Sequence, residues 1–387
     1  MHMTTAQRFE QVKEIRRREL ERQPVARDIK DLPVSYELIS DEWLTQALCT
    51  KAPGARVVSH TLDKADEGTS NRRRIFLKYN EAGDRAGLPA SVFCKATQGL
   101  ESRLVLGLNR STEGETIFYN QIRPVLDIEA PIGLFANVDT ETLNSILIMK
   151  DMGGQVQFCD HKTPISLERA RSQVELLAKL HGSFYGKPER QKLLQPYLSL
   201  KEWCDLTEEA FIWSDARMRG FQAGEAVIPP RLFRRADEVE SATRRVLDGH
   251  TQLPTTLIHS DVHLKNWYVA ANGRMGLSDW QICVKGCGVR DLAYAVSTSL
   301  TIENRRAWEM DLIKHYVECV AAEDATPLSF DQTVLLYRQQ LLGGLAMWTS
   351  TLTPAPGSPD MQPAETSLEF IKRMTHAIDD LDALGSF

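Results

Sequence analysis

The spacing of hydrophobic and polar positions changes near residue 165 of the chain. Before this point, short runs rich in β-branched and aromatic residues predict strands over 56–62, 73–79, 91–96 and 145–150. One stretch with helical spacing, 113–122, interrupts them. The first part of the chain is therefore expected to be rich in β-structure.

After residue 165 the hydrophobic period becomes that of a helix, since Leu176, Leu177, Leu180 and Phe184 fall on one face. Later helices are predicted near 200–219, 229–248, 303–323, 328–350 and 363–384. One β-rich island, 256–278, contains Asn272-Gly273, a strong hairpin signal. The pattern predicts an α+β chain, with a β-rich N-terminal lobe and a mainly helical C-terminal lobe that holds one hairpin.

The length of 387 residues exceeds the size at which a single core stops growing, so two domains are expected. Residues 1–35 are dense in charge and carry only a weak apolar stripe, which favours a solvated helical extension. Residues 36–151 are predicted to form the N-terminal lobe, and 152–387 the C-terminal lobe.

Composition excludes several classes of protein. Apolar residues at 42% and charged residues at 25% are ordinary for a globular fold, and the net charge of −6 offers no footprint for nucleic acid. No stretch approaches the roughly 20 apolar residues that span a bilayer. Seven scattered cysteines do not form a disulfide framework, which favours a cytoplasmic protein without membrane or nucleic-acid partners.

The candidate catalytic residues lie in the β-rich island and directly after it. The segment Leu257-Ile258-His259-Ser260-Asp261-Val262-His263-Leu264-Lys265-Asn266 places a carboxylate and an amide in one short loop. Asp279 follows the strand that returns after the turn. Hairpin geometry is therefore expected to bring Asp261, Asn266 and Asp279 to one end of a small sheet.

Phosphoryl transfer requires such a set of side chains. A carboxylate orients the attacking hydroxyl and accepts its proton, while hard oxygen ligands hold Mg²⁺ against the phosphates of ATP. Asp261 fits the base, and Asn266 and Asp279 fit the metal ligands. Asp and Asn also occur singly in turns, where they only bond the backbone. The spacing of Asp261 and Asn266 equals that of the kinase loop H-R-D-x-x-x-x-N, which favours a catalytic role over a role in a turn.

These residues resemble the signature H-G-D-x-H-x-x-N, followed by I-D-W/F-Q, of the aminoglycoside phosphotransferase and choline kinase superfamily. The similarity is greatest to its ecdysteroid-kinase-like branch and extends over roughly residues 40–350. It implies a bilobal, protein-kinase-like fold. Ser260 stands where the family usually has glycine, and the loop is expected to survive the change. The matching positions are His259, Asp261, His263, Asn266, Asp279, Trp280 and Gln281.

The resemblance also implies a nucleotide site in the N-terminal lobe. Lys95 would grip the phosphates and pair with Glu115, and a Gly68–Asn71 turn would cover the phosphates. The strand that ends near Lys150 would bind adenine through its backbone. The cofactor-binding residues implied are Gly68, Ser70, Asn71, Lys95, Glu115, Met149 and Met152. His181 and Asp291 are assigned structural roles, and the role of His263 stays open.

The sequence thus favours an ATP- and Mg²⁺-dependent kinase that phosphorylates a hydroxyl of a small molecule. A protein kinase is disfavoured because the loop arginine, D-F-G and A-P-E are missing. A catalytically inactive nucleotide-binding module is the remaining alternative. Aromatic residues between 200 and 240 suit a partly apolar alcohol, although a helix core is the favoured explanation for them. The sequence fixes neither the acceptor nor the oligomeric state.

Overall fold

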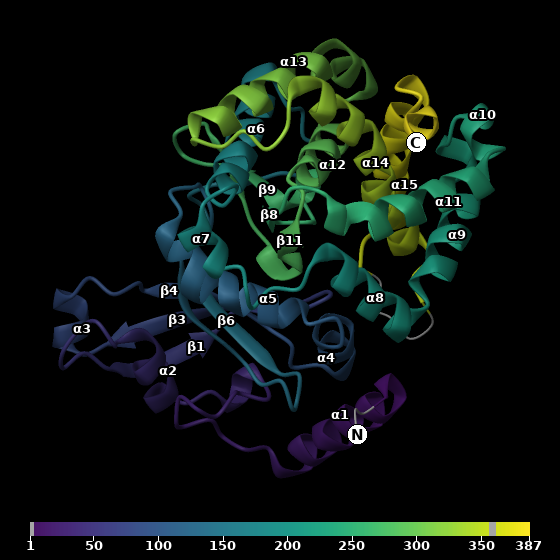
Figure 1. The fold of residues 1–387 in the computed structure, drawn as a ribbon. Coiled ribbons are helices and arrows are strands. Elements are labelled where there is room, and N and C mark those ends of the chain that lie inside the picture. Colours follow the sequence, from purple (N-terminus) through teal and green to yellow (C-terminus); the bar gives the residue numbers. More distant parts are fainter. Residues whose placement is uncertain (1–3, 356–360) are drawn as a thin grey trace. The chain divides into compact units, whose positions relative to one another are not determined.

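The computed structural model describes residues 4–355 and 361–387, apart from the side chain of Glu67, and the chain forms two compact units (Figure 1). The first unit contains residues 4–125 and 131–153, and the second contains 126–130, 154–355 and 361–387. The first is rich in strands and the second in helices, which confirms the predicted α+β class.

An antiparallel sheet with strand order β1-β3-β4-β6-β5 forms the first unit, and β2 pairs with the start of β3. One face of the sheet is apolar because alternate residues such as Ile75, Val92 and Ile148 point into a core that also contains Trp43. All four predicted strands are present. The six strands are β1 (Val57–Leu62), β2 (Asp66–Glu67), β3 (Asn71–Tyr79), β4 (Ser91–Ala96), β5 (Gly133–Val138) and β6 (Ser145–Lys150).

The N-terminal helix α1 (Thr5–Arg22) packs on α4 (Leu100–Gly107). Val12 is fully buried with Leu104 and Leu143, and Arg103 bonds Glu19 at 3.0 Å. One face of the expected solvated extension is therefore packed. The apolar stripe was too weak in sequence to reveal this, because Val12 is the only buried residue of the helix.

Three further helices belong to the first unit. Helix α2 (Asp41–Leu48) is capped by Ser40, and α3 (Glu81–Arg85) by Asn80. The predicted helix over 113–122 begins as α5 (Ser111–Ile117) and continues as a π-helix over Phe118–Ile122.

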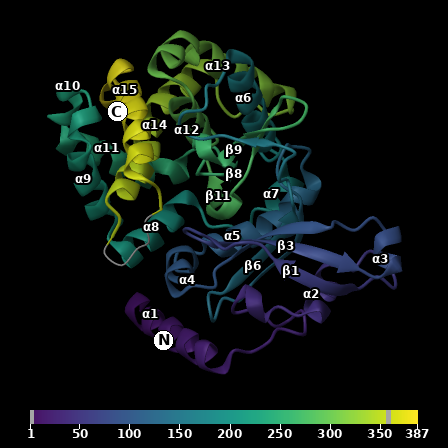
Figure 2. The same cartoon turned by 180° about the vertical axis from the view of Figure 1, so that it is seen from behind.

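Helices make up most of the second unit, and Figures 1 and 2 show α6 and α13 lying side by side, as α14 and α15 do. The predicted helix over 200–219 is divided at Ile212, whose φ of 47° ends α8 and starts α9. The helices are α6 (Leu167–Gly182), α7 (Pro188–Lys192), α8 (Leu200–Phe211), α9 (Trp213–Ala223), α10 (Pro230–Phe233), α11 (Ala236–Gly249), α12 (Val289–Ser299), α13 (Ile302–Ala322), α14 (Phe330–Leu352) and α15 (Ala364–Asp380).

Helix α12 was not among the predicted helices. Every one of its residues is buried, including the polar Arg290 and Asp291. It packs against α14 and α15 in the middle of the unit.

The β-rich island forms two separate strand pairs. Strands β9 (Trp267–Val269) and β10 (Met275–Leu277) make the predicted hairpin, and Gly273 in its turn has a φ of 81°. Strand β7 (Gln157–Phe158) adds to β9. Strand β8 (Thr256–Ile258), which leads into the Asp261 loop, pairs with β11 (Val284–Gly286). The hairpin geometry expected for 256–278 is therefore right for β9 and β10 but wrong for β8, which pairs outside the island.

All seven cysteines are free thiols, and only Cys319 has appreciable exposure. Cys94 lies in the core of the first unit, whereas Cys204 and Cys287 are buried in the second. In the described part of the chain, no helix combines the length and the apolar character that a membrane span requires.

Candidate active site

A buried carboxylate on α12 holds the loop that carries Asp261. The two oxygens of Asp291 accept the backbone N–H groups of His259 and Ser260, at 2.7 and 2.9 Å. His181 lies 3.3 Å from the same carboxylate and 2.8 Å from the hydroxyl of Tyr316. Burial acts to raise the pKa of Asp291, but His181 and then the charges of His259 and Arg290 lower it below its ordinary value. Asp291 therefore fixes the loop as an anion.

Ser260, which replaces the family's glycine, has a φ of 68°. The loop keeps its shape, as expected, but a serine is held in a left-handed conformation that glycine adopts without strain. Its hydroxyl is buried, with no hydrogen-bond partner among the residues described.

We expect Ser260→Gly to raise the free energy of unfolding by about 1 kcal/mol, because it removes the left-handed strain. Urea unfolding of wild type and variant measures the difference. Ser260→Ala is the matched control, since it removes the hydroxyl but retains the strain. Equal stability of Ser260→Gly and Ser260→Ala would contradict the explanation.

Three side chains surround the carboxylate of Asp261. The hydroxyl of Tyr294 donates to Oδ1 at 3.1 Å, and Asn266 Nδ2 lies 3.3 Å from Oδ2 and 2.7 Å from the backbone carbonyl oxygen of Asp261. His263 Nε2 is 3.5 Å from Oδ2. Burial favours a raised pKa for Asp261, but His263 outweighs it and the pKa is about 2. The Asp261 side chain remains 15% exposed, so an ionised carboxylate still has accessible surface.

An aromatic group lies behind His263. The ring centroid of His263 is 5.0 Å from that of Trp348, 5.9 Å from that of Phe370 and 6.5 Å from that of Tyr294. The open question about His263 thus has a structural answer, since it bridges Asp261 to this aromatic group. Tyr294 was not predicted, although its place three residues after Asp291 on one helix was a usable signal. Trp348 and Phe370 are distant in sequence, and no local pattern marked them.

The predicted metal ligands lie at the end of the β9–β10 hairpin. The backbone N–H and hydroxyl of Ser278 donate to the carbonyl oxygen of Asn266 at 2.8 and 2.9 Å, which places Asp279 beside the loop. Asp279 has a φ of 63° and is half-buried. Carboxylate and amide oxygens suit Mg²⁺, which usually takes one or two protein ligands and completes its shell with water and phosphate. The donor set therefore fits this ion.

Within 4–355 and 361–387, no group of three or more His, Cys, Asp and Glu side chains is placed to hold a metal ion.

The predicted nucleotide residues all belong to the first unit. Lys95 Nζ lies 2.9 Å from Glu115 Oε1, and the two side chains are only 8% and 9% exposed. Asn71 Oδ1 accepts the backbone N–H groups of Gln98 and Gly99, which ties the turn to the following loop. Lys95 is therefore paired with Glu115, and the side chain of Asn71 bonds the backbone of the loop that follows β4.

The other predicted nucleotide residues lie in the turn and at the end of β6. Ser70 is buried, and Gly68 has no left-handed φ, so the turn does not depend on glycine for its conformation. Met149 pairs with Phe93 within the sheet, and Met152 follows the strand. The ten predicted site residues thus divide between the two units, with Asp261, Asn266 and Asp279 in the second.

Lys95→Met is expected to lower kcat/KM for ATP and also to destabilise the first unit, because it leaves Glu115 buried without its cation. Breaking such a pair costs about 3–5 kcal/mol. The double variant Lys95→Met with Glu115→Gln should recover most of the stability but none of the ATP use. Recovery of ATP use in the double variant would remove Lys95 from the nucleotide site.

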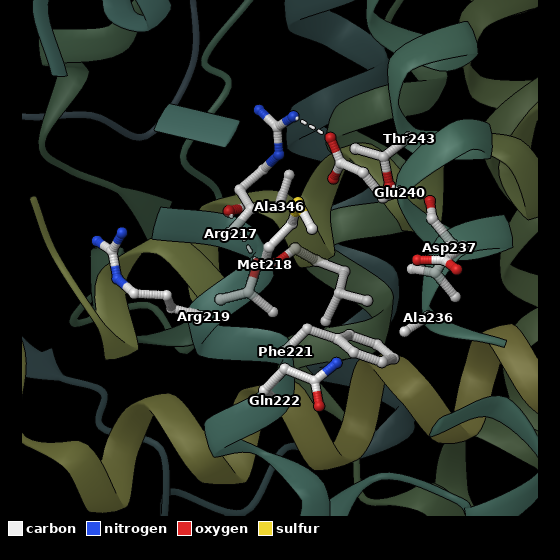
Figure 3. Close-up of a pocket in the computed structure, with 13 residues that line it drawn as sticks. Arg217, Met218, Arg219, Phe221, Gln222, Ala236, Asp237, Glu240, Thr243 and Ala346 are labelled. Carbon is white, nitrogen blue, oxygen red and sulfur yellow. Dashed lines mark hydrogen bonds and ion pairs between the residues drawn. The ribbon is translucent and has the colours of Figure 1, made fainter. Parts of the chain in front are cut away.

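Helices α9, α11 and α14 enclose a pocket of about 370 Å³ in the second unit. Figure 3 shows Met218, Phe221 and Ala346 around it, with Arg217 bonded to Glu240 at 2.8 Å. Leu345 and Thr349 of α14 also line it, whereas Trp348 of the same helix contacts His263. The pocket therefore shares helix α14 with the surroundings of Asp261.

The aromatic residues between 200 and 240 mostly serve the helix core. Trp203 and Trp213 are buried in one cluster, with ring centroids 5.9 Å apart. Phe221 stacks on Phe233 at 5.8 Å while also lining the pocket. The favoured explanation of these aromatics as packing is thus what the structure shows for both tryptophans.

Several solved structures resemble this one at low sequence identity. An ethanolamine kinase from Plasmodium vivax is 12% identical, with a TM-score of 0.48 over 98% of this chain and 94% of that one. The choline kinase LicA from Streptococcus pneumoniae is 14% identical, with a TM-score of 0.43 over 86% and 94%. An aminoglycoside phosphotransferase from Streptomyces rimosus is 17% identical, with a TM-score of 0.43 over 73% and 92%.

No curated protein sequence matches the chain. A family model described as "Phosphotransferase enzyme family" matches residues 110–326, which is more than half of the 387 residues. The matched segment includes the Asp261 loop, the hairpin and Asp291. The predicted superfamily and enzyme class are confirmed, while the ecdysteroid-kinase-like branch stays a prediction. The chain belongs to the phosphotransferase enzyme family.

Proposed function

We propose that this phosphotransferase moves the terminal phosphate of ATP to a hydroxyl of a small molecule, with Asp261 as the catalytic base. The observation that carries the proposal is the position of Asp261, on a loop fixed by Asp291, with its carboxylate held by Tyr294 and Asn266 and still partly exposed. Such a carboxylate would accept a hydrogen bond from an incoming hydroxyl.

The residues of the loop have distinct roles in this proposal. Asp261 would orient the acceptor hydroxyl and take its proton as the new bond to phosphorus forms. Tyr294, which donates to the other carboxylate oxygen at 3.1 Å, would keep the carboxylate from rotating. His263 would hold the carboxylate at Oδ2, with its ring packed against Trp348.

Asn266 and Asp279 would hold Mg²⁺, and Lys95 would hold the phosphates. When bound, this ion neutralises charge on the phosphates of ATP and so favours attack by the hydroxyl. Asp279 supplies the only formal charge of the two ligands. Asn266 leaves its side-chain oxygen Oδ1 for the ion, because its two hydrogen bonds to Asp261 use the side-chain nitrogen Nδ2.

We expect Asp279→Ala to abolish Mg²⁺-dependent binding of ATP, because a neutral amide alone is a weak ligand for Mg²⁺. Titration of ATP with and without Mg²⁺ measures the effect on purified protein. Asp311→Ala, a change at an exposed position of α13, is the control and should bind as wild type does. Unchanged Mg²⁺-dependent affinity in Asp279→Ala would remove it from the metal role.

The direct test of the function is transfer of labelled phosphate from ATP to an extract of small metabolites. A labelled small molecule that forms with wild type but not with Asp261→Asn supports the proposal. Label found only in protein would instead indicate a protein kinase. ATP binding without transfer to any acceptor would indicate an inactive nucleotide-binding module.

A further inference from the structure

Arg290 is a fully buried cation whose guanidinium makes no hydrogen bond to the described part of the chain. It lies in the first turn of α12, next to Asp291, and none of its surface is exposed. Its Nε, Nη1 and Nη2 atoms have no hydrogen-bond partner within residues 4–355 and 361–387. The contact it does make is with the ring of Tyr294, whose centroid is 5.8 Å from Cζ. The five N–H donors of the guanidinium are therefore buried away from water without an acceptor in the described chain.

The other buried arginines are arranged differently. Arg103 bonds Glu19 at 3.0 Å, Arg217 bonds Glu240 at 2.8 Å and Arg305 bonds Glu309 at 2.7 Å. Arg373 bonds Glu369 at 2.7 Å. Each of these cations is paired with a carboxylate of the chain, as buried charges in proteins usually are. Arg290 stands apart, which points to a partner that the chain itself does not supply.

Asp291 does not act as that partner, although it is adjacent. Its two oxygens already accept the N–H groups of His259 and Ser260, and His181 lies 3.3 Å from one of them. It compensates part of the charge of Arg290 without bonding it.

His250 adds a further donor to the same electrostatic environment. Its Nε2 accepts the N–H of Cys287 at 2.8 Å, so in the neutral ring the proton is on Nδ1, which is buried without a partner in the described chain. Burial and then the charge of Arg290 lower the pKa of His250 to about 3. What is missing around Arg290 is therefore an acceptor of hydrogen bonds.

Tyr294 connects Arg290 with the reacting end of the site. Its hydroxyl donates to Asp261 at 3.1 Å, while its ring contacts the guanidinium. A single side chain, that of Tyr294, thus contacts both the base and Arg290. We propose that the acceptor alcohol carries a carboxylate and that Arg290 binds it through two parallel hydrogen bonds. This inference rests on the function proposed above and adds the chemical class of its substrate.

The first experiment needs no ligand. If Arg290 binds an anion, its unpaired buried charge destabilises the protein when no anion is bound. Arg290→Met should therefore leave Tm within about 2 °C of wild type or raise it. Arg305→Met is the matched control, because Arg305 is equally buried but paired, and its Tm should fall by about 5 °C or more. A fall in Arg290→Met like that in Arg305→Met, or failure of Arg290→Met to fold, would show a structural guanidinium and overturn the proposal.

The second experiment uses a panel of small hydroxycarboxylates, their amides, matched amino alcohols and inorganic phosphate. Because Arg290 is covered in this structure, binding requires the side chains over it to move, and thermal stabilisation in solution detects the outcome. We expect at least one hydroxycarboxylate, but not its amide, to stabilise wild type and accept phosphate from ATP. Its KM should rise about 10- to 100-fold in Arg290→Met, as expected for loss of a charge-assisted pair.

The remaining outcomes separate this inference from the proposed function. Equal use of a neutral alcohol by wild type and Arg290→Met, with no carboxylate stabilising either, would overturn the inference and leave the kinase function standing. Stabilisation by inorganic phosphate alone, or by no member of the panel, would also overturn it. Stabilisation by a hydroxycarboxylate that requires Arg290, without any transfer of phosphate, would support the site and count against the kinase function.

Discussion

Asp261→Asn should lower kcat by about 10²- to 10⁴-fold, which is the usual effect of removing a general base. The amide keeps the size of the side chain and its bond from Tyr294, but it is a far weaker proton acceptor. Binding of ATP should persist, since Asp261 is assigned to the acceptor and not to the metal. A turnover assay with the true acceptor, beside a titration with a non-hydrolysable ATP analogue, measures the two effects separately.

A matched control for this variant is Tyr294→Phe, which removes one hydrogen bond to Asp261 and keeps the ring. Its loss of kcat should be much smaller than that of Asp261→Asn, because the carboxylate itself remains. Wild-type turnover in Asp261→Asn would refute the base assignment. Loss of turnover together with Mg²⁺-dependent ATP binding, in folded protein, would move Asp261 into the metal site.

Asp291→Ala should lower the free energy of unfolding by about 3–5 kcal/mol, because it leaves buried donors without their anionic acceptor. The backbone N–H groups of His259 and Ser260 would lose bonds of 2.7 and 2.9 Å in a fully buried place. Urea unfolding measures the loss. Asp311→Ala, at an exposed position of α13, should change the same quantity by less than about 0.5 kcal/mol.

The same variant should lose turnover even under conditions where it stays folded, because the Asp261 loop depends on the Asp291 carboxylate for its shape. A loss of stability below about 1 kcal/mol, or normal kcat in folded Asp291→Ala, would show that the loop is held by other contacts. The stability and kcat of Asp291→Asn should lie between those of wild type and Asp291→Ala, since its amide offers one oxygen in place of two.

The candidate site was predictable where a few residues in one loop carry the chemistry. The spacing of Asp261 and Asn266 is local, and the Asn272-Gly273 turn fixed the following hairpin. The pairing of β8 with β11 was missed because it joins strands separated by the whole island, and periodicity does not specify which strands pair. Helix α12 was also missed, although its sequence has a helical period, and nothing in that sequence shows that its polar residues are buried together with the apolar ones.

Residues whose importance comes from their surroundings could not be found in the sequence. In the sequence, Arg290 looks like any arginine at the start of a helix. Only the absence of a hydrogen-bond partner for its guanidinium among the described residues sets it apart. Trp348 reaches His263 from α14 because of how helices pack, which depends on the whole second unit. Lys95 was expected from its strand, but its degree of burial against Glu115 was not.

The placement of the cysteines provides natural reporters of local opening. Burial raises the pKa of the Cys94 thiol in the first unit well above its ordinary range, and it raises that of Cys204 to about 12 and that of Cys287 to about 11 in the second. A thiol reagent can modify such groups only when the protein around them opens. Labelling rates read peptide by peptide would therefore give the opening free energy of each unit separately. Slower labelling of Cys94 alone on adding ATP would assign nucleotide binding to the first unit without any mutation.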